Sequence, residues 1–275
     1  MVVKSFSDFG KSAKKLLNDD FVVGKKVEVK TTTADAVNFT ATGVESDKDG
    51  AISGSLSWKY KVYGNSFTTK ITTANALSNE VVSEQLGVKG LKNTLNVALG
   101  SSSHSASTKL EYKHDMVAAT VLADVTSQTV TDSVALGYKL FNIGGAATFE
   151  IASKSVSQYG LGASLVHEDS ELTLTTADKF NKFKLAFGHT ISPKYEVAAE
   201  ATYNREKTSV SMATGIKYTG DGATVKAKTD NLGTVSLAYI ANIDKSTKLT
   251  MSSSANVKEL EKGQKFGIAI TLDQP

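Results

Sequence analysis

Short segments in which apolar and polar residues alternate recur about every 11 to 15 residues from about residue 25 onward. Successive side chains of a β-strand point to opposite faces of the sheet, so each segment predicts a strand with two unlike faces. The segment 52–62, ISGSLSWKYKV, shows this pattern along its whole length. Its apolar face consists of Ile52, Leu56, Trp58, Tyr60 and Val62, and its polar face of Ser53, Ser55, Ser57, Lys59 and Lys61.

Nineteen such segments can be placed between 25–32 and 264–272, among them 80–87 and 159–166, although periodicity alone supports roughly 17 to 20. The chain has 21 glycines and only 2 prolines, which suits long strands joined by tight turns. So many strands must either pack as separate sheets or close into a barrel. Two or three soluble β-sandwich domains are therefore an alternative, although no linker of distinct composition divides the chain.

The mean hydropathy is -0.15, and no apolar run approaches the roughly 18 residues that a membrane-spanning helix needs. This excludes a helical membrane protein but not a membrane β-barrel, whose strands alternate lipid-facing and lumen-facing residues. The N-terminus lacks the apolar stretch of a secretory signal peptide, which disfavours a bacterial outer-membrane protein. A net charge of +3 without a compact basic run gives no reason to expect nucleic acid as a partner.

The beginning of the chain has a helical rather than a strand period. Apolar residues recur at helical spacing between Phe6 and Leu17, and lysines occupy the opposite side. We expect a basic amphipathic helix of about three turns, capped by Ser5 or Ser7. Because a helix this short is marginal in water, it must pack on a membrane surface or on the rest of the protein.

Sequence motifs for catalysis are missing. The four histidines are scattered without metal-ligand spacing, there is no cysteine, and no nucleophile or phosphate-loop motif occurs. The acidic run 167–171, HEDSE, is interpreted as a solvated turn between strands. We expect neither an enzyme nor a bound metal or cofactor.

The stretch 7–21 and the alternating stretch 57–95 resemble the voltage-dependent anion channels, the mitochondrial porins. The stretch 7–21, SDFGKSAKKLLNDDF, contains the family's GK-[SA]-A pattern at 10–13, and its GLK motif occurs as Gly90, Leu91 and Lys92. The stretches 110–115, LEYKHD, and 257–272, VKELEKGQKFGIAITL, look especially like plant-type members. The similarity extends over essentially the whole chain.

Two further motifs carry the same resemblance. The stretch 218–239 is similar to the family's signature region, although it is one residue shorter after Asp221. Its matching positions are Ala227, Lys228, Asp230 and Asn231. The sorting signal of mitochondrial barrels, polar-x-glycine-x-x-hydrophobic-x-hydrophobic, is matched by Lys265, Gly267, Ile270 and Leu272.

This resemblance implies a 19-stranded transmembrane β-barrel in the mitochondrial outer membrane, with the amphipathic helix inside the pore. Residues 1–24 would form the helix and linker, and residues 25–275 the barrel. The implied function is a voltage-gated, weakly anion-selective channel for small metabolites, nucleotides such as ATP and ADP, and ions. The pore-lining and voltage-sensing candidates are Lys4, Lys11, Lys14, Lys15, Lys59 and Lys61.

The resemblance also suggests nucleotide contacts and partners. The candidate nucleotide-binding residues are Thr234, Val235, Ser236, Ser252, Ser253, Ser254, Ala255 and Asn256. Membrane lipids surround such a barrel, and self-association or assembly with other outer-membrane proteins is a further expectation. A lipid-facing glutamate of animal members is replaced by Thr69, so functions attached to that acid are not expected here. The protein-import pore of the same barrel family is the nearest alternative function.

Overall fold

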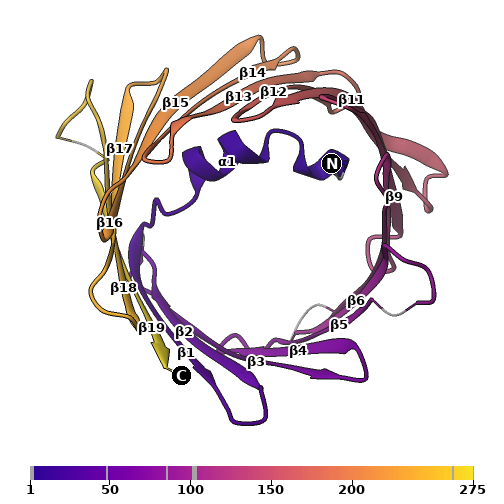
Figure 1. The fold of residues 1–275 in the computed structure, drawn as a ribbon, viewed down its shortest axis with the longest axis horizontal. Coiled ribbons are helices and arrows are strands. Elements are labelled where there is room, and N and C mark those ends of the chain that lie inside the picture. The colour runs from indigo at the N-terminus through magenta and orange to yellow at the C-terminus, as the bar shows by residue number, and fades with distance from the viewer. Residues whose placement is uncertain (1–2, 48, 85, 101–103, 262, 275) are drawn as a thin grey trace.

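The chain forms one closed β-barrel with a short helical segment inside it (Figure 1). The structure is a computed structural model that describes residues 3–47, 49–84, 86–100, 104–261 and 263–274. Residues 1–2 of the expected helix and linker and residue 275 of the expected barrel lie outside the described residues, as does residue 85 of the expected strand 80–87. A single 19-stranded sheet confirms the predicted fold class and does not support separate β-sandwich domains.

Each strand pairs with its neighbours in chain order. The strands are β1 (Gly24–Thr32), β2 (Asn38–Glu45), β3 (Ile52–Val62), β4 (Asn65–Thr72), β5 (Leu77–Ser83), β6 (Leu91–Leu99), β7 (His104–Lys113), β8 (Val117–Asp124), β9 (Thr129–Tyr138), β10 (Phe141–Glu150), β11 (Ser155–His167), β12 (Ser170–Ala177), β13 (Lys182–Ser192), β14 (Tyr195–Asn204), β15 (Ser209–Thr219), β16 (Ala223–Asp230), β17 (Thr234–Asn242), β18 (Thr247–Asn256) and β19 (Lys265–Gln274).

Several strand bounds differ from the sequence prediction by three or four residues, among them the starts of β5 and β11. β5 begins at Leu77 rather than residue 80, because Leu77 pairs with both Ile71 and Leu99. β11 begins at Ser155 rather than residue 159, and a register shift between Thr148 and Phe149 accommodates its early start. Irregular registers of this kind do not follow a simple alternation, so they are hard to read from sequence.

The sheet has an odd number of strands and so an even number of antiparallel steps between the first and the last, which brings β1 and β19 together in parallel. β1 pairs with β19 from Gly24↔Gly267 to Thr31↔Gln274, and every other neighbouring pair is antiparallel. This parallel seam closes the ring and removes the free edges that an open sheet would leave exposed.

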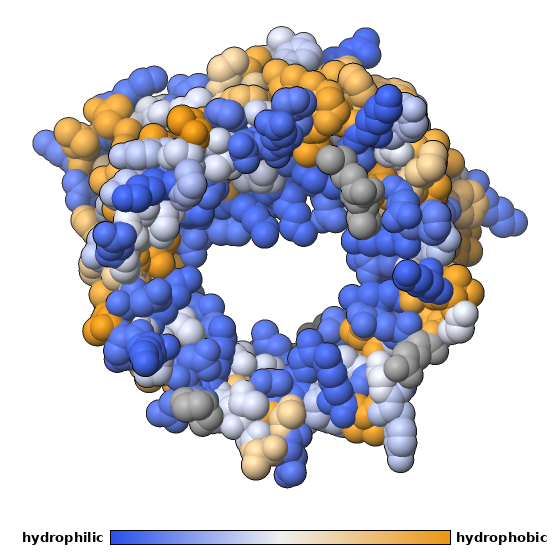
Figure 2. Space-filling model, viewed as in Figure 1, coloured by the Kyte–Doolittle hydropathy of each residue, from blue (hydrophilic) through white to orange (hydrophobic). Residues whose placement is uncertain are grey.

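The two faces of the barrel wall have opposite character, as Figure 2 shows by its hydrophilic lumen and its apolar outer surface. Ala186 and Ala198 pack against the internal helix and so mark the lumen side. Directly paired residues share a face, and faces alternate along a strand, so the register carries this assignment around the ring. It places Leu56 and Val62 on the outside, where both are exposed as expected of lipid-facing residues.

The N-terminal segment contains two short helical pieces rather than one continuous helix. They are the 3-10 turn η1 (Phe6–Asp8) and the α-helix α1 (Lys11–Asn18), with Gly10 between them in the left-handed conformation at φ 71°. The prediction of a serine cap is wrong. Ser5 makes no capping hydrogen bond, Ser7 lies within η1, and the N-cap residue of α1 is Gly10. Within the described residues, neither helical piece has the length and hydrophobicity needed to cross a bilayer.

Candidate functional site: the lumen and its helix

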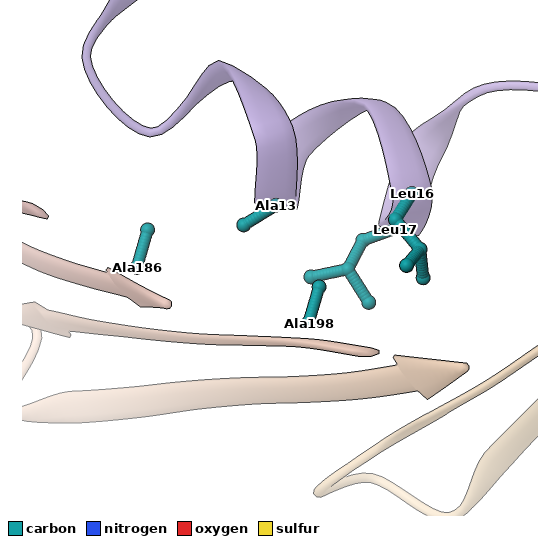
Figure 3. Close-up of a cluster of buried hydrophobic side chains, with 5 residues drawn as sticks. All are labelled: Ala13, Leu16, Leu17, Ala186 and Ala198. Atoms are coloured by element: carbon teal, nitrogen blue, oxygen red, sulfur yellow. The ribbon is translucent and has the colours of Figure 1, made fainter. Parts of the chain in front are cut away.

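The helix α1 lies against the inner wall with its apolar side. Ala13, Leu16 and Leu17 are buried against Ala186 of β13 and Ala198 of β14 (Figure 3). Small wall residues at these positions allow the helix to approach the sheet closely. The lysines of the helix therefore point away from this wall, as the helical period predicted: Lys11, Lys14 and Lys15 are exposed.

Two glycines of the wall make the close approach of the helix possible. A Cβ atom at Gly188 would lie 2.6 Å from Ser12 Oγ, and one at Gly215 would lie 2.9 Å from a methyl carbon of Leu17. Both distances are shorter than real Cβ contacts. The wall is thus shaped for this helix, and larger residues at either position would push it into the lumen.

A buried carboxylate holds the start of the helical segment. Glu171 of β12 accepts hydrogen bonds from the backbone N–H of Gly10 at 3.1 Å and from the Ser12 hydroxyl at 2.5 Å. Lys4 Nζ lies 2.9 Å from Oε1 of Glu171, the oxygen that also accepts the Gly10 hydrogen bond, and the Glu171 side chain is only 5% exposed. The interpretation of 167–171 as a solvated turn is therefore wrong for Glu171, which begins the lumen face of β12.

Two wall lysines hold the opposite end of the helix. Lys228 of β16 donates to the carbonyl oxygen of Leu17 at 2.8 Å and lies over the Phe21 ring. Lys226 donates to the carbonyl oxygens of Lys15 and Asp19 and pairs with Asp20 at 2.7 Å. The last carbonyls of a helix have no partner within the helix, so these cations satisfy them and complement the helix dipole.

Three residues of the stretch 218–239, which resembles the family's signature region, stabilise neighbouring elements of the fold. Lys228 binds the helix end, whereas Asp230 accepts the backbone N–H groups of Leu232 and Thr234 in the next turn. The Asn231 side chain bridges to β15, donating to the carbonyl oxygen of Val210. These residues position the helix and the β16–β17 turn.

Lysines outnumber carboxylates on the lumen-facing positions of the described strands. The lysines are Lys26, Lys30, Lys59, Lys61, Lys70, Lys92, Lys109, Lys113, Lys182, Lys184, Lys217, Lys226, Lys228, Lys248 and Lys265. The carboxylates are Glu28, Glu80, Glu111, Asp124, Glu150, Glu171, Glu196, Glu200, Asp230 and Asp273. The lumen therefore carries a positive excess.

The predicted pore lysines fall into two groups by their partners. Lys4 pairs with Glu171, and Lys11 pairs with Asp8 at 2.9 Å, a hydrogen bond that raises the pKa of Lys11. Lys14 and Lys15 form no ion pair with any described residue, nor do Lys59 and Lys61 on β3.

The lysines of β3 have a neighbour that the sequence reading did not single out. Lys70 of β4 pairs across the sheet with Ser57, so it shares the lumen face with Lys59 and Lys61. It also makes no ion pair with a described residue. In Figure 1 the β3–β4 wall lies across the lumen from α1, so unpaired cations face the passage from two sides.

Only part of the candidate nucleotide-binding set faces the lumen. Thr234, Ser236, Ser252, Ser254 and Asn256 share the lumen face of β17 and β18, whereas Val235, Ser253 and Ala255 face outward. The Ser252 hydroxyl already donates to the carbonyl oxygen of Val22. The structure does not bring all eight residues together around one lumen site.

The other motif residues are spread between a turn and the seam. Gly90 has φ 86°, and a Cβ there would lie 2.1 Å from the carbonyl oxygen of Lys113, so this turn needs glycine. Lys92 faces the lumen and Leu91 faces outward. On β19, Lys265 and Gly267 face inward and Ile270 and Leu272 outward. Gly267 lies under the Val22 backbone, where a side chain would collide.

These features define a class: a large β-barrel porin with an apolar outer surface, a charged lumen and an internal helix. The chain belongs to the eukaryotic porin family, whose model matches residues 3–267. It is 29% identical over 99% of both chains to the Xenopus laevis "Non-selective voltage-gated ion channel VDAC2". It is 28% identical to the Drosophila melanogaster "Voltage-dependent anion-selective channel", covering 99% of this chain and 100% of the relative.

A plant relative is as similar as the frog protein. The Arabidopsis thaliana "Mitochondrial outer membrane protein porin 2" is 29% identical, covering 97% of both chains. Among solved structures, a mutant of the Rh. blastica porin shares the fold with a TM-score of 0.53 at 8% identity. That match covers 80% of this chain and 89% of the other, and at such low identity it concerns the fold alone.

Proposed function

We propose that the protein is a voltage-gated, weakly anion-selective channel of the mitochondrial outer membrane that passes metabolites, nucleotides such as ATP and ADP, and ions. The observation that carries this proposal is a group of lumen cations with no ion-pair partner among the described residues, including Lys14 and Lys15 on α1 and Lys59, Lys61 and Lys70 on the far wall. Fixed cations raise the local concentration of anions inside a pore. The family membership and the names of the relatives support the same function.

The preference for anions is weak, because the Debye length at physiological salt is about 8 Å and a wide pore is screened over much of its width. Reversal potentials under a salt gradient across a planar bilayer test this. We expect a small shift toward the anion equilibrium potential in the open state. Cation preference in the open state would contradict the proposal.

The helix acts as part of the voltage sensor in this proposal. One elementary charge moved through the whole field is worth about 2.3 kcal/mol per 100 mV, so even partial displacement of Lys11, Lys14 and Lys15 biases gating. Replacing all three with Gln is expected to make the conductance–voltage curve shallower. The control replaces Lys154, Lys194 and Lys207, which lie in turns, with Gln. Equal steepness in the helix variant and the wild type would exclude the helix as sensor.

Nucleotides interact in this proposal with the lumen-facing half of the candidate set. Ser236 and Ser254 are directly paired on β17 and β18 and face the lumen. Because a hydrogen bond contributes about 0.5–1.5 kcal/mol, replacing both with Ala is expected to weaken ATP-dependent current noise severalfold. The matched control is the outward pair Val235→Ala and Ser253→Ala, which should leave it unchanged. Equal effects of the two double variants would remove these strands from the nucleotide path.

A further inference from the structure

One carboxylate of the described strands faces the bilayer side of the barrel wall without an ion-pair partner. Asp132 of β9 pairs with Val121 and Ala147, and its sequence neighbours Thr131 and Ser133 face the lumen. The side chain is exposed and forms no hydrogen bond or ion pair with a described residue. The other charged side chains on the outer face of the described strands, Lys25 and Glu45, neutralise each other at 3.0 Å. Asp132 is thus an uncompensated charge facing lipid.

A shallow apolar groove of about 450 Å³ begins beside this carboxylate. Its floor is made by Gly145 and Ala147 of β10, which are small, and its far wall by Tyr159 and Leu161 of β11. The floor and walls follow from the register, since Asp132, Ala147 and Tyr159 are consecutive partners across three strands.

An aromatic pair closes the end of the groove nearest the rim. Phe180, from the β12–β13 turn, packs edge-on against Tyr159 with ring centroids 5.2 Å apart. Aromatic residues are enriched where a barrel meets the membrane interface. Asp132 lies three positions into β9, about 10 Å along the strand from its start, so it is close to the same interface. The adjoining Lys179 is exposed.

We propose that this groove binds a membrane phospholipid with an ammonium headgroup. The ammonium group pairs with Asp132 and lies against the Tyr159–Phe180 rings, which attract cations through their π faces. An acyl chain lies over Gly145 and Ala147. Lys179 supplies the opposite charge for the phosphate. A second copy of this chain fits less well, because a two-fold contact centred on the groove would bring two Asp132 carboxylates together.

Brominated lipids, which quench nearby tryptophan, provide the test. The reporter variant is Leu161→Trp in a Trp58→Phe background, refolded into vesicles containing brominated phosphatidylethanolamine or brominated phosphatidylglycerol. We expect the ethanolamine lipid to show about two- to fivefold higher relative affinity at this reporter, the range of a partly solvated ion pair. Wild-type protein, whose reporter is Trp58 on the outer face of β3, should show no such preference.

The decisive variant is Asp132→Asn in the reporter background, which should abolish the preference. Glu150→Gln, on the lumen face of β10, is the matched control and should retain it. Phe180→Leu should reduce it, and provides an independent measure if Asp132→Asn refolds poorly. Equal quenching by both lipids, or a preference that survives Asp132→Asn, would overturn the proposal. Weak quenching that rises when the protein is diluted into excess lipid would also overturn it, because this would indicate that a second copy of the chain covers the groove.

Discussion

The two sides of the lumen hold their lysines in different ways. On the side covered by the helix, from β12 to β16, Lys184 pairs with Glu200, Lys217 with Glu196 and Lys226 with Asp20. On the bare β3–β4 wall, Lys59, Lys61 and Lys70 have no ion-pair partner among the described residues. The covered side uses its charges to hold a structure, and the bare side leaves them available to mobile ions.

The lysines of the N-terminal segment are used in both ways, some in ion pairs and some exposed to the lumen. Lys4 is bound to Glu171 on the covered side, whereas Lys14 and Lys15 point into the passage from the same segment. The N-terminal segment therefore anchors itself through Lys4 and exposes the other part of its charge on α1. Net charge alone does not distinguish the two uses, but the partner of each lysine does.

The largest expected effect comes from reversing the charges of the bare wall. Replacing Lys59, Lys61 and Lys70 with Glu should convert the pore to cation preference. Three positive charges of the lumen become negative, so its net charge falls by six units. Reversal potentials under a salt gradient measure this. The control neutralises an existing pair, Lys109→Gln with Glu111→Gln, which lie 2.9 Å apart, and should leave selectivity nearly unchanged. An unchanged sign in the triple variant would contradict a role for this wall.

A smaller effect is expected from removing the anchor on the covered side. Glu171→Gln should weaken helix docking by about 1–3 kcal/mol, since charged hydrogen bonds to Lys4, Ser12 and Gly10 are lost or weakened. The chain has no cysteine, so spin labels at Lys14→Cys and Lys61→Cys can report the distance across the lumen.

In the Glu171→Gln variant the distance distribution should broaden, because part of the population leaves the wall. Glu196→Gln is the control, since Glu196 pairs with Lys217 of the wall rather than with the helix. A narrow distribution in both variants would show that the helix is held chiefly by its apolar face and its other end.

The smallest effect is expected at the break between η1 and α1. Gly10→Ala places a Cβ in the left-handed region at φ 71° and 3.2 Å from Ala186 Cβ, which should weaken docking by about 1 kcal/mol. The same spin-label distance measures it. Gly43→Ala is the control, because a Cβ there meets nothing within 4 Å. An effect larger than that of Glu171→Gln would reverse the order of the two anchors.

The alternation predicted the strands because it is a local property, and it places Lys59 and Lys61 on one face. It left barrel and sandwich both open, and only the resemblance to the mitochondrial porins implied the barrel. The apolar stripe of the helix was equally readable. Glu171 was misread because its neighbours Glu168 and Asp169 do lie in a turn, and its burial depends on Gly10 and the helix, 161 residues earlier in the chain. Gly188 and Gly215 offered a signal, since glycine on a polar strand face often marks a close backbone approach.

The limits of the sequence reading also show at Asp132. In the alternating pattern of β9, an acid at an apolar position looks like a lapse in the pattern, and only the register fixes which side it faces. The candidate nucleotide residues show the converse, because a contiguous run such as 252–256 necessarily divides between two faces of the wall.

The parallel seam has a consequence for how the molecule can be made. Gly24 and Gly267 are neighbours in space, yet nearly the whole chain separates them, so closure is the contact of highest sequence separation in the barrel. Until β19 has been synthesised, the edges of β1 and β18 both remain open to wrong pairing. The strand that matches the sorting-signal pattern is thus also the strand whose pairing ends this hazard.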